Sequence, residues 1–197
     1  MPKRLVFLLA GCFMSCLLLV ACSDDGQQPA AQQSAGDMLL PAGQEVLFEV
    51  SHVNQAWGYR LAGHYVDREG RIWQFDHSSE PWQAPASCIP AEALRDKLTR
   101  QQEQVGRVSP QELAKAVALV KAAAAGPLGD RVDTGCRDFG GMSYLAYTYD
   151  EDEDCYTPVL LHLRGDWGRK NLAPAAAELR LWLDGILGFQ GMSNCEP

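Results

Sequence analysis

Residues 59–76 read YRLAGHYVDREGRIWQFD, two runs of aromatic and β-branched residues on either side of the turn sequence Asp67-Arg68-Glu69-Gly70. Such runs around a polar, glycine-containing turn predict a β-hairpin. The preceding segment at 46–53, VLFEVSHV, has the same character and predicts a further strand. With strands at 46–53, 59–66 and 71–76, the first third of the chain is predicted to be an antiparallel β-meander.

The faces of this meander follow from its register, because successive side chains of a strand point to opposite faces. We expect the turns to pair Val66 with Arg71 and Val53 with Gly58. The face then expected in the core carries seven large residues: Val46, Phe48, Val50, Tyr59, Leu61, Tyr65 and Ile72. The opposite face is mixed polar and aromatic: Glu49, Arg60, His64, Trp73, Phe75 and His77. Four residues of this second face form the predicted binding face: Arg60, His64, Trp73 and Phe75. The alternative is that the aromatic rings pack inside the domain.

The rest of the chain alternates between helical and strand patterns. Leu94 and Leu98 lie one helical turn apart in a charged segment, which predicts a surface helix over 91–104. Ser109-Pro110-Gln111-Glu112 has an N-cap, a proline at the first helical position and a capping-box glutamate, so a second helix is predicted from there to about Ala125. Strands at 141–149 and 156–163 and a helix at 174–187 follow. The predicted fold class is α+β: a small antiparallel sheet of meander and C-terminal hairpin, packed with about three helices.

The N-terminal segment has the layout of a secretory signal. Lys3 and Arg4 precede a predominantly apolar stretch over 5–20, which ends in Leu19-Val20-Ala21-Cys22 and gives way to a polar sequence. This pattern resembles the signal peptide and lipobox of bacterial lipoproteins. The resemblance implies that residues 1–21 are removed and that Cys22 is lipidated, which anchors the protein to a membrane. An ordinary signal peptide and an uncleaved anchor are the alternatives, although the stretch is shorter than the roughly 20 apolar residues of a spanning helix.

A second lipobox-like quartet, Leu9-Ala10-Gly11-Cys12, lies too early, because cleavage there would leave a very short apolar region. In enteric lipoproteins the residue after the lipidated cysteine influences sorting, and Ser23 at this position favours the outer membrane over the inner membrane. Residues 22–42 are rich in Gln, Ala, Ser, Gly, Pro and Asp, which predicts a flexible tether. The short apolar segment at 38–40 could instead dock on the domain, which is predicted to span residues 43–197.

Seven cysteines are present, and Cys12, Cys16 and Cys22 belong to the signal and the lipidation site. The four that remain, Cys88, Cys136, Cys155 and Cys195, predict two disulfides in an oxidising compartment, with three possible connectivities. Cys136 and Cys155 flank a predicted strand and therefore lie far apart. A last helix antiparallel to the strand at 156–163 would return the chain toward Cys155. We therefore favour Cys88–Cys136 and Cys155–Cys195.

The charge of the chain is acidic, with 17 Lys and Arg against 25 Asp and Glu. Loss of Lys3 and Arg4 with the signal leaves 15 basic and 25 acidic residues, hence a formal charge of −10. An acidic protein repels nucleic acid and anionic lipid headgroups. We expect no nucleic-acid partner, and no motif indicates a cofactor.

Motifs that could carry chemistry are weak. Asp133-Thr134-Gly135 is similar to the active-site triplet of aspartic proteases, but those enzymes need two such carboxylates and this triplet occurs once. Asp150, Asp152 and Asp154 alternate as calcium ligands often do, yet an EF-hand loop would need glycine where Cys155 stands. A solvated acidic turn is the alternative. The histidines at 52, 64, 77 and 162 are not expected to converge on a metal, and Arg164-Gly165-Asp166 matches the integrin-binding tripeptide only by its three letters.

These patterns favour a lipid-anchored protein facing the periplasm, whose domain is a non-enzymatic module that binds an envelope protein or a glycan. The alternative function is a periplasmic hydrolase whose site is assembled from residues distant in sequence. Asp133, Asp138 and a histidine are the residues considered for such a site.

Overall fold

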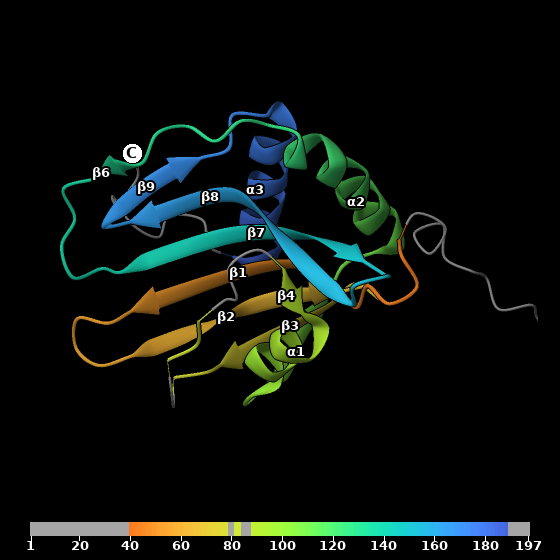
Figure 1. Ribbon diagram of the computed structural model, residues 1–197, viewed down its shortest axis with the longest axis horizontal. Helices are drawn as coiled ribbons and strands as arrows, with labels where there is room; N and C mark the ends of the chain where they lie inside the picture. The colour runs from red at the N-terminus through yellow and green to blue at the C-terminus, as the bar shows by residue number, and fades with distance from the viewer. Residues whose placement is uncertain (1–39, 79–80, 84–87, 189–197) are drawn as a thin grey trace, which may run out of the picture. The chain divides into compact units, whose positions relative to one another are not determined.

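The computed structural model describes residues 40–78, 81–83 and 88–188 (Figure 1). They lie in the second of the two structural units into which the chain divides, Gln33–Pro197. Within the described ranges the fold is α+β, with one antiparallel sheet of nine strands and three helices, which confirms the predicted class. Across the same ranges, no helix combines the length and the apolarity needed to cross a bilayer.

The sheet is built around the predicted meander and hairpin, which become neighbours because β1 pairs with β7. The strands are β1 (Val46–Asn54), β2 (Arg60–Asp67), β3 (Arg71–Asp76), β4 (Ile89–Pro90), β5 (Glu103–Arg107), β6 (Val132–Asp133), β7 (Gly141–Asp150), β8 (Cys155–Gly165) and β9 (Trp167–Lys170). Their order in the sheet is β5-β3-β2-β1-β7-β8-β9-β6, and β4 pairs with β8 outside this path. The long strands therefore lie in the centre and the short ones at the edges.

The three helices are α1 (Ala91–Thr99), α2 (Pro110–Ala124) and α3 (Pro174–Leu187). The predicted start of α2 is confirmed, because the Ser109 hydroxyl accepts the backbone N–H of Glu112 and the Glu112 carboxylate accepts that of Ser109. The first helix ends earlier than predicted. Arg100 is extended and Gln101 has φ of 46°, so the chain leaves the helix and forms β5 along the edge of β3.

The register of the meander differs from the predicted one. Val66 pairs with Ile72, one residue later in the chain than expected, and Val53 pairs with Leu61, three residues later than expected. After β2 the cause is a three-residue loop that ends at Gly70 with φ of 75°, the geometry of a hairpin with a G1 bulge. The extra loop residue shifts the whole of β3 relative to β2.

A register shift by an odd number of residues moves each side chain of a strand to the other face of the sheet. Phe48 and Val50 consequently share a face with Val66, whereas Leu61 and Tyr65 lie on the opposite face. Each face has its own hydrophobic cluster. The first joins the sheet to α2 and α3, which lie side by side (Figure 1), and the second joins it to α1. The meander thus has a core on both faces rather than one core face and one solvent face.

A buried ion pair lies in the cluster beneath α1. Lys97 Nζ on α1 is 2.6 Å from Glu49 Oε1 on β1, and the side chains are 4% and 0% exposed. Ser51 Oγ and Tyr147 OH also donate to the Glu49 carboxylate, at 2.5 and 2.7 Å. Burial alone would raise the pKa of Glu49, but the attraction and hydrogen bonds of these three partners hold it below its ordinary value.

The disulfide pairing corrects the prediction. Cys88 is bonded to Cys155, with 5.6 Å between the Cα atoms, because β4 places the residues after Cys88 beside the start of β8. Cys136 is disulfide-bonded as well, and Cys195 lies outside the described residues. The predicted pairs Cys88–Cys136 and Cys155–Cys195 are therefore both wrong. A two-residue strand such as β4 is too short to leave a pattern in the sequence.

The last residues assigned to the tether contact the domain. Leu40 packs against the cluster shared by the sheet, α2 and α3. Arg68 donates to the carbonyl oxygen of Ala42 at 2.5 Å, and the Ala42 N–H donates to the Glu151 carboxylate at 2.5 Å. The domain therefore includes Leu40, at the end of the sheet where β1 begins. The other predictions for residues 1–39, including lipidation at Cys22, fall outside the described residues.

Candidate functional site

The predicted binding face is not formed. Phe75 is buried in the cluster beneath α1, while His64 lies on the opposite face of the sheet, beside Val50. Arg60 is exposed at the start of β2. The error follows from the G1 bulge, which separates residues that the expected register would have placed together.

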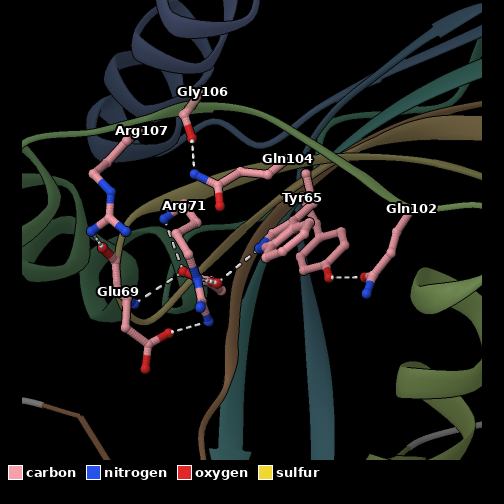
Figure 2. Close-up of polar contacts among 9 residues, drawn as sticks. Tyr65, Glu69, Arg71, Gln102, Gln104, Gly106 and Arg107 are labelled. Carbon is pink, nitrogen blue, oxygen red and sulfur yellow. Dashed lines mark hydrogen bonds and ion pairs between the residues drawn. The ribbon is translucent and has the colours of Figure 1, made fainter.

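Trp73, the fourth of these residues, is part of a polar cluster around the β2–β3 turn (Figure 2). Its indole N–H donates to Asp67 Oδ2 at 2.8 Å, and Arg71 Nε donates to the same oxygen at 2.6 Å. The ring stacks on Tyr65 at 6.3 Å between centroids, and the Arg71 guanidinium lies 5.3 Å from its centre. The Trp73 ring thus contacts Tyr65 and Arg71, two residues of the same domain.

The same cluster connects the turn to β5. Tyr65 OH donates to Gln102 Oε1 at 2.8 Å, and Arg107 donates to the carbonyl oxygen of Glu69 at 3.2 Å (Figure 2). Burial, followed by the charge of Asp67, raises the pKa of Tyr65 to about 12. A cleft of about 340 Å³ adjoins the cluster. Because the donors described here are paired with acceptors inside the domain, we assign this cluster to holding the turn and β5 in place.

A second depression lies at the other end of the sheet, and we call it the Trp167 groove. Its volume is about 460 Å³. Its lining comes from the end of β1 and the loop that follows, the segment before β7, the start of β7 and the β8–β9 turn: Val53, Asn54, Gln55, Ala56, Arg131, Gly140, Gly141, Ser143, Leu163, Asp166 and Trp167. Ser143 pairs with Leu163, so their side chains share a face of the sheet. The groove therefore continues from that face to the loops at its end.

The floor of the groove is fixed by two glycines and one carboxylate. Gly165 has φ of 133°, and a Cβ atom there would collide with the carbonyl oxygen of Gly140. The carboxylate of Asp166 accepts the backbone N–H groups of Phe139 at 3.0 Å and Gly140 at 3.1 Å. Asn54 adds a bond from its side-chain amide to the carbonyl oxygen of Asp138 at 2.8 Å. These contacts hold three separate segments in one arrangement.

The rim of the groove offers polar groups that the domain does not use itself. Trp167 remains 44% exposed although the guanidinium of Arg131 lies 4.4 Å from its ring centre. Within the described part of the chain, the side chains of Gln55, Arg131, Ser143 and Trp167 have no hydrogen-bond or ion-pair partner. Trp57, in the same β1–β2 loop, is 86% exposed. An aromatic ring beside unengaged donors is the composition expected of a ligand site.

The predicted calcium candidate is not supported by the geometry. Asp150 Oδ1 accepts the backbone N–H groups of Asp152 at 3.0 Å and Glu153 at 3.2 Å, and Asp154 accepts the hydroxyl of Tyr149 at 2.5 Å. Among the residues that the structure describes, no three or more His, Cys, Asp or Glu side chains come together as metal ligands. The acidic segment is a turn in which Asp150 and Asp154 accept hydrogen bonds from neighbouring residues, while Glu151 accepts the N–H of Ala42.

The residues considered for a hydrolase are placed in the segment before β7. Asp133 is exposed and pairs with Arg137 at 2.9 Å. The hydrogen bond from Arg137 and a second from the N–H of Gly135 lower the pKa of Asp133, so it stays ionised rather than sharing a proton. His52 bonds the carbonyl oxygen of Phe139 at 2.7 Å.

Comparisons with protein-family models, with curated proteins and with solved structures find no match for this chain.

The groove was missed in the sequence because its residues come from segments far apart in the chain. One local signal was present. In the tripeptide Arg164-Gly165-Asp166, the buried Arg164 and Gly165 end β8, and Asp166 lies between β8 and β9. Gly165 lies close to the backbone of Gly140, and Asp166 is bonded to the neighbouring segment. A glycine and an aspartate directly before an exposed tryptophan are typical of a tight turn that is held by side-chain hydrogen bonds.

Proposed function

We propose that this chain is a lipid-anchored protein of the bacterial cell envelope, and that its domain is a non-enzymatic module that binds an envelope component in the Trp167 groove. The anchor is the lipidated Cys22 inferred from the signal, and Ser23 favours the outer membrane. The Cys88–Cys155 bridge suits an oxidising compartment outside the cytoplasm.

The observation that carries this proposal is the position of the groove. The chain joins the domain at Leu40, beside the start of β1, whereas residues 54–56 at the end of β1 line the groove (Figure 1). The nine residues of β1, at about 3.3 Å each, separate these two ends by roughly 30 Å. A domain attached through its N-terminal side would therefore present the groove at the end farthest from its attachment.

The anchor is tested by mass spectrometry of the mature protein. We expect the first residue to be Cys22 with added acyl chains, and we expect a Cys22→Ala variant to lose them. A mature chain that begins at another residue, or that carries no lipid, would contradict this part of the proposal.

The binding site is tested with a photo-crosslinking residue in the full-length, membrane-bound protein. It is placed at Gln55 on the groove and, as a matched control, at Leu181, which is 61% exposed on α3. We expect adducts from position 55 that disappear when Trp167→Ala is added, and no effect of Trp167→Ala on adducts from position 181. Equal adducts at both positions, or adducts at 55 that are indifferent to Trp167, would overturn the assignment of the groove.

A further inference from the structure

We infer that the Trp167 groove binds a saccharide that carries a carboxylate, with the sugar ring on Trp167 and the carboxylate on Arg131. This inference rests on the proposed function, which makes the groove a binding site facing the envelope, and it adds the chemical class of the ligand. It follows from three features of the groove: an accessible indole, an arginine without an acidic partner, and unengaged polar groups around both.

The first feature is the indole of Trp167. A sugar ring has C–H faces that are apolar and an edge of hydroxyl groups that is polar, so it fits a flat aromatic surface bordered by hydrogen-bonding groups. Trp167 has this setting, because nearly half of its surface is exposed at the groove. Trp73 does not, since its ring lies between Tyr65 and Arg71.

The second feature is the state of Arg131. Acidic residues outnumber basic ones in this chain, and Arg71, Arg95 and Arg137 each pair with a carboxylate. The exposed Arg60 and Arg107 have no ion-pair partner among the described residues. Arg131 likewise has no ion-pair partner among the described residues, and it differs from those two arginines because its guanidinium lies over the Trp167 ring, 4.4 Å from the ring centre. A guanidinium in this position is oriented by the ring and keeps its donors free, which suits bidentate recognition of a carboxylate. The ligand is therefore expected to bring a carboxylate to Arg131, because the one carboxylate that lines the groove, Asp166, is bonded to the backbone N–H groups of Phe139 and Gly140.

The third feature is a set of polar groups that could form hydrogen bonds with the hydroxyl groups of a sugar. Gln55 provides an amide and Ser143 a hydroxyl, neither of them bonded within the described part of the chain. Each carboxylate oxygen of Asp166 accepts one backbone N–H and has a further lone pair to offer. Because its two bonds already hold the Asp166 carboxylate in place, little ordering of this residue would be required when a ligand binds.

A peptide is the other macromolecular ligand to consider, and the groove lacks what a peptide strand would use. Strand addition needs an open sheet edge with unpaired backbone groups. At the groove, β1, β7 and β8 are each paired on both sides, and β9 pairs with β8 and β6. The open edge beside the groove belongs to β6, which has only two residues and is too short for a ladder. The groove therefore presents side chains, not a free backbone ladder, and this favours a saccharide.

The test is calorimetric titration of the full mature protein, solubilised in detergent, with three probes. N-acetylmuramic acid and N-acetylglucosamine are nearly the same sugar with and without a carboxylate, and trialanine is a peptide with a free carboxylate. We expect N-acetylmuramic acid to bind at least about tenfold more tightly than the other two, the loss expected for one charge-assisted hydrogen bond.

Variants then assign the contacts. Arg131→Gln should weaken N-acetylmuramic acid about 10-fold to 100-fold and leave N-acetylglucosamine unchanged, whereas Trp167→Ala should weaken both sugars. Arg107→Gln, at an exposed arginine on the opposite edge strand β5, is the matched control and should change neither. Both groove substitutions lie at exposed side chains, and an unchanged melting temperature would verify that the domain is intact.

Equal affinity for the two sugars, no binding of either, or tighter binding of trialanine would overturn the saccharide inference. Each of these outcomes can be told apart from failure of the proposed function. If crosslinks at Gln55 still depend on Trp167, the groove is a binding site for another class of ligand. If they do not, the site itself is wrong.

Discussion

Replacing Lys97 with Met should destabilise the domain by about 3–5 kcal/mol near neutral pH, the range found when one partner of a buried ion pair is removed. Met keeps the apolar stem that packs beside Trp82, whose ring centre is 4.4 Å from Lys97 Nζ. What is lost is the charge opposite Glu49, which is 0% exposed. Ser51 and Tyr147 would still donate hydrogen bonds, but neither neutralises a buried carboxylate.

The pH dependence of this loss has a definite sign. In the native protein the pKa of Glu49 is below its unfolded value, so the pair stabilises the fold above the unfolded pKa and the stabilisation disappears as pH falls through the folded pKa. Without Lys97, burial is no longer offset and the folded pKa of Glu49 should rise above the unfolded value. The free energy of unfolding of the variant is then reduced at pH values where Glu49 is charged. This loss becomes smaller as pH falls and the carboxylate takes up a proton. The difference between the two proteins should shrink from about pH 7 to about pH 4.

The measurement is urea unfolding of both proteins, with disulfides intact, at about pH 7 and about pH 4.5. The matched control is the double variant Glu49→Gln, Lys97→Met, in which a neutral amide still accepts from Ser51 and Tyr147. We expect it to recover most of the loss. A cost under about 1 kcal/mol for Lys97→Met at neutral pH, or a cost that is the same at both pH values, would refute this account of the pair.

Three further substitutions test the local geometry. Gly165→Ala should lower the free energy of unfolding by at least about 3 kcal/mol, because its φ disfavours a side chain and its Cβ would meet Gly140; a melting temperature within a few degrees of native would contradict this. Ser109→Ala should cost about 1 kcal/mol in urea unfolding by removing the capping box of α2, and no measurable loss would show that the cap is dispensable. Replacing Cys88 and Cys155 together by serine should cost about 4 kcal/mol, since their bridge closes a separation of 67 residues; a peptide map joining Cys88 to another cysteine would contradict the pairing itself.

The sequence predicted the elements that have a clear local sequence pattern. α2 was located by Ser109-Pro110 at its start, and α3 runs over the predicted range Pro174–Leu187. The missed elements are those whose structure depends on a partner. β5 is mostly exposed and has no clear alternation, so it is a strand only because it lies along β3.

The functional surface was harder to predict than the fold because it depends on register. The prediction placed Phe75 beside His64, and one extra residue in the loop before Arg71 sent their side chains to opposite faces. The Trp167 groove depends on three strand ends meeting, which is a property of the sheet order β1-β7-β8 and not of any one segment. Local pattern could identify exposed aromatic residues but not which of them would share a surface.

The Cys88–Cys155 bridge also bears on how the protein is made. If the chain is exported as we propose, its N-terminal end enters the oxidising compartment first, and Cys136 arrives there before Cys155 does. Of these two cysteines, the first that Cys88 meets is therefore not its native partner, and the native pair forms across it. Correct maturation would then require either that Cys88 stays reduced until β8 has folded or that a mispaired bridge is reshuffled by thiol exchange. On this basis we expect the yield of native protein to depend on a disulfide isomerase and not only on an oxidase.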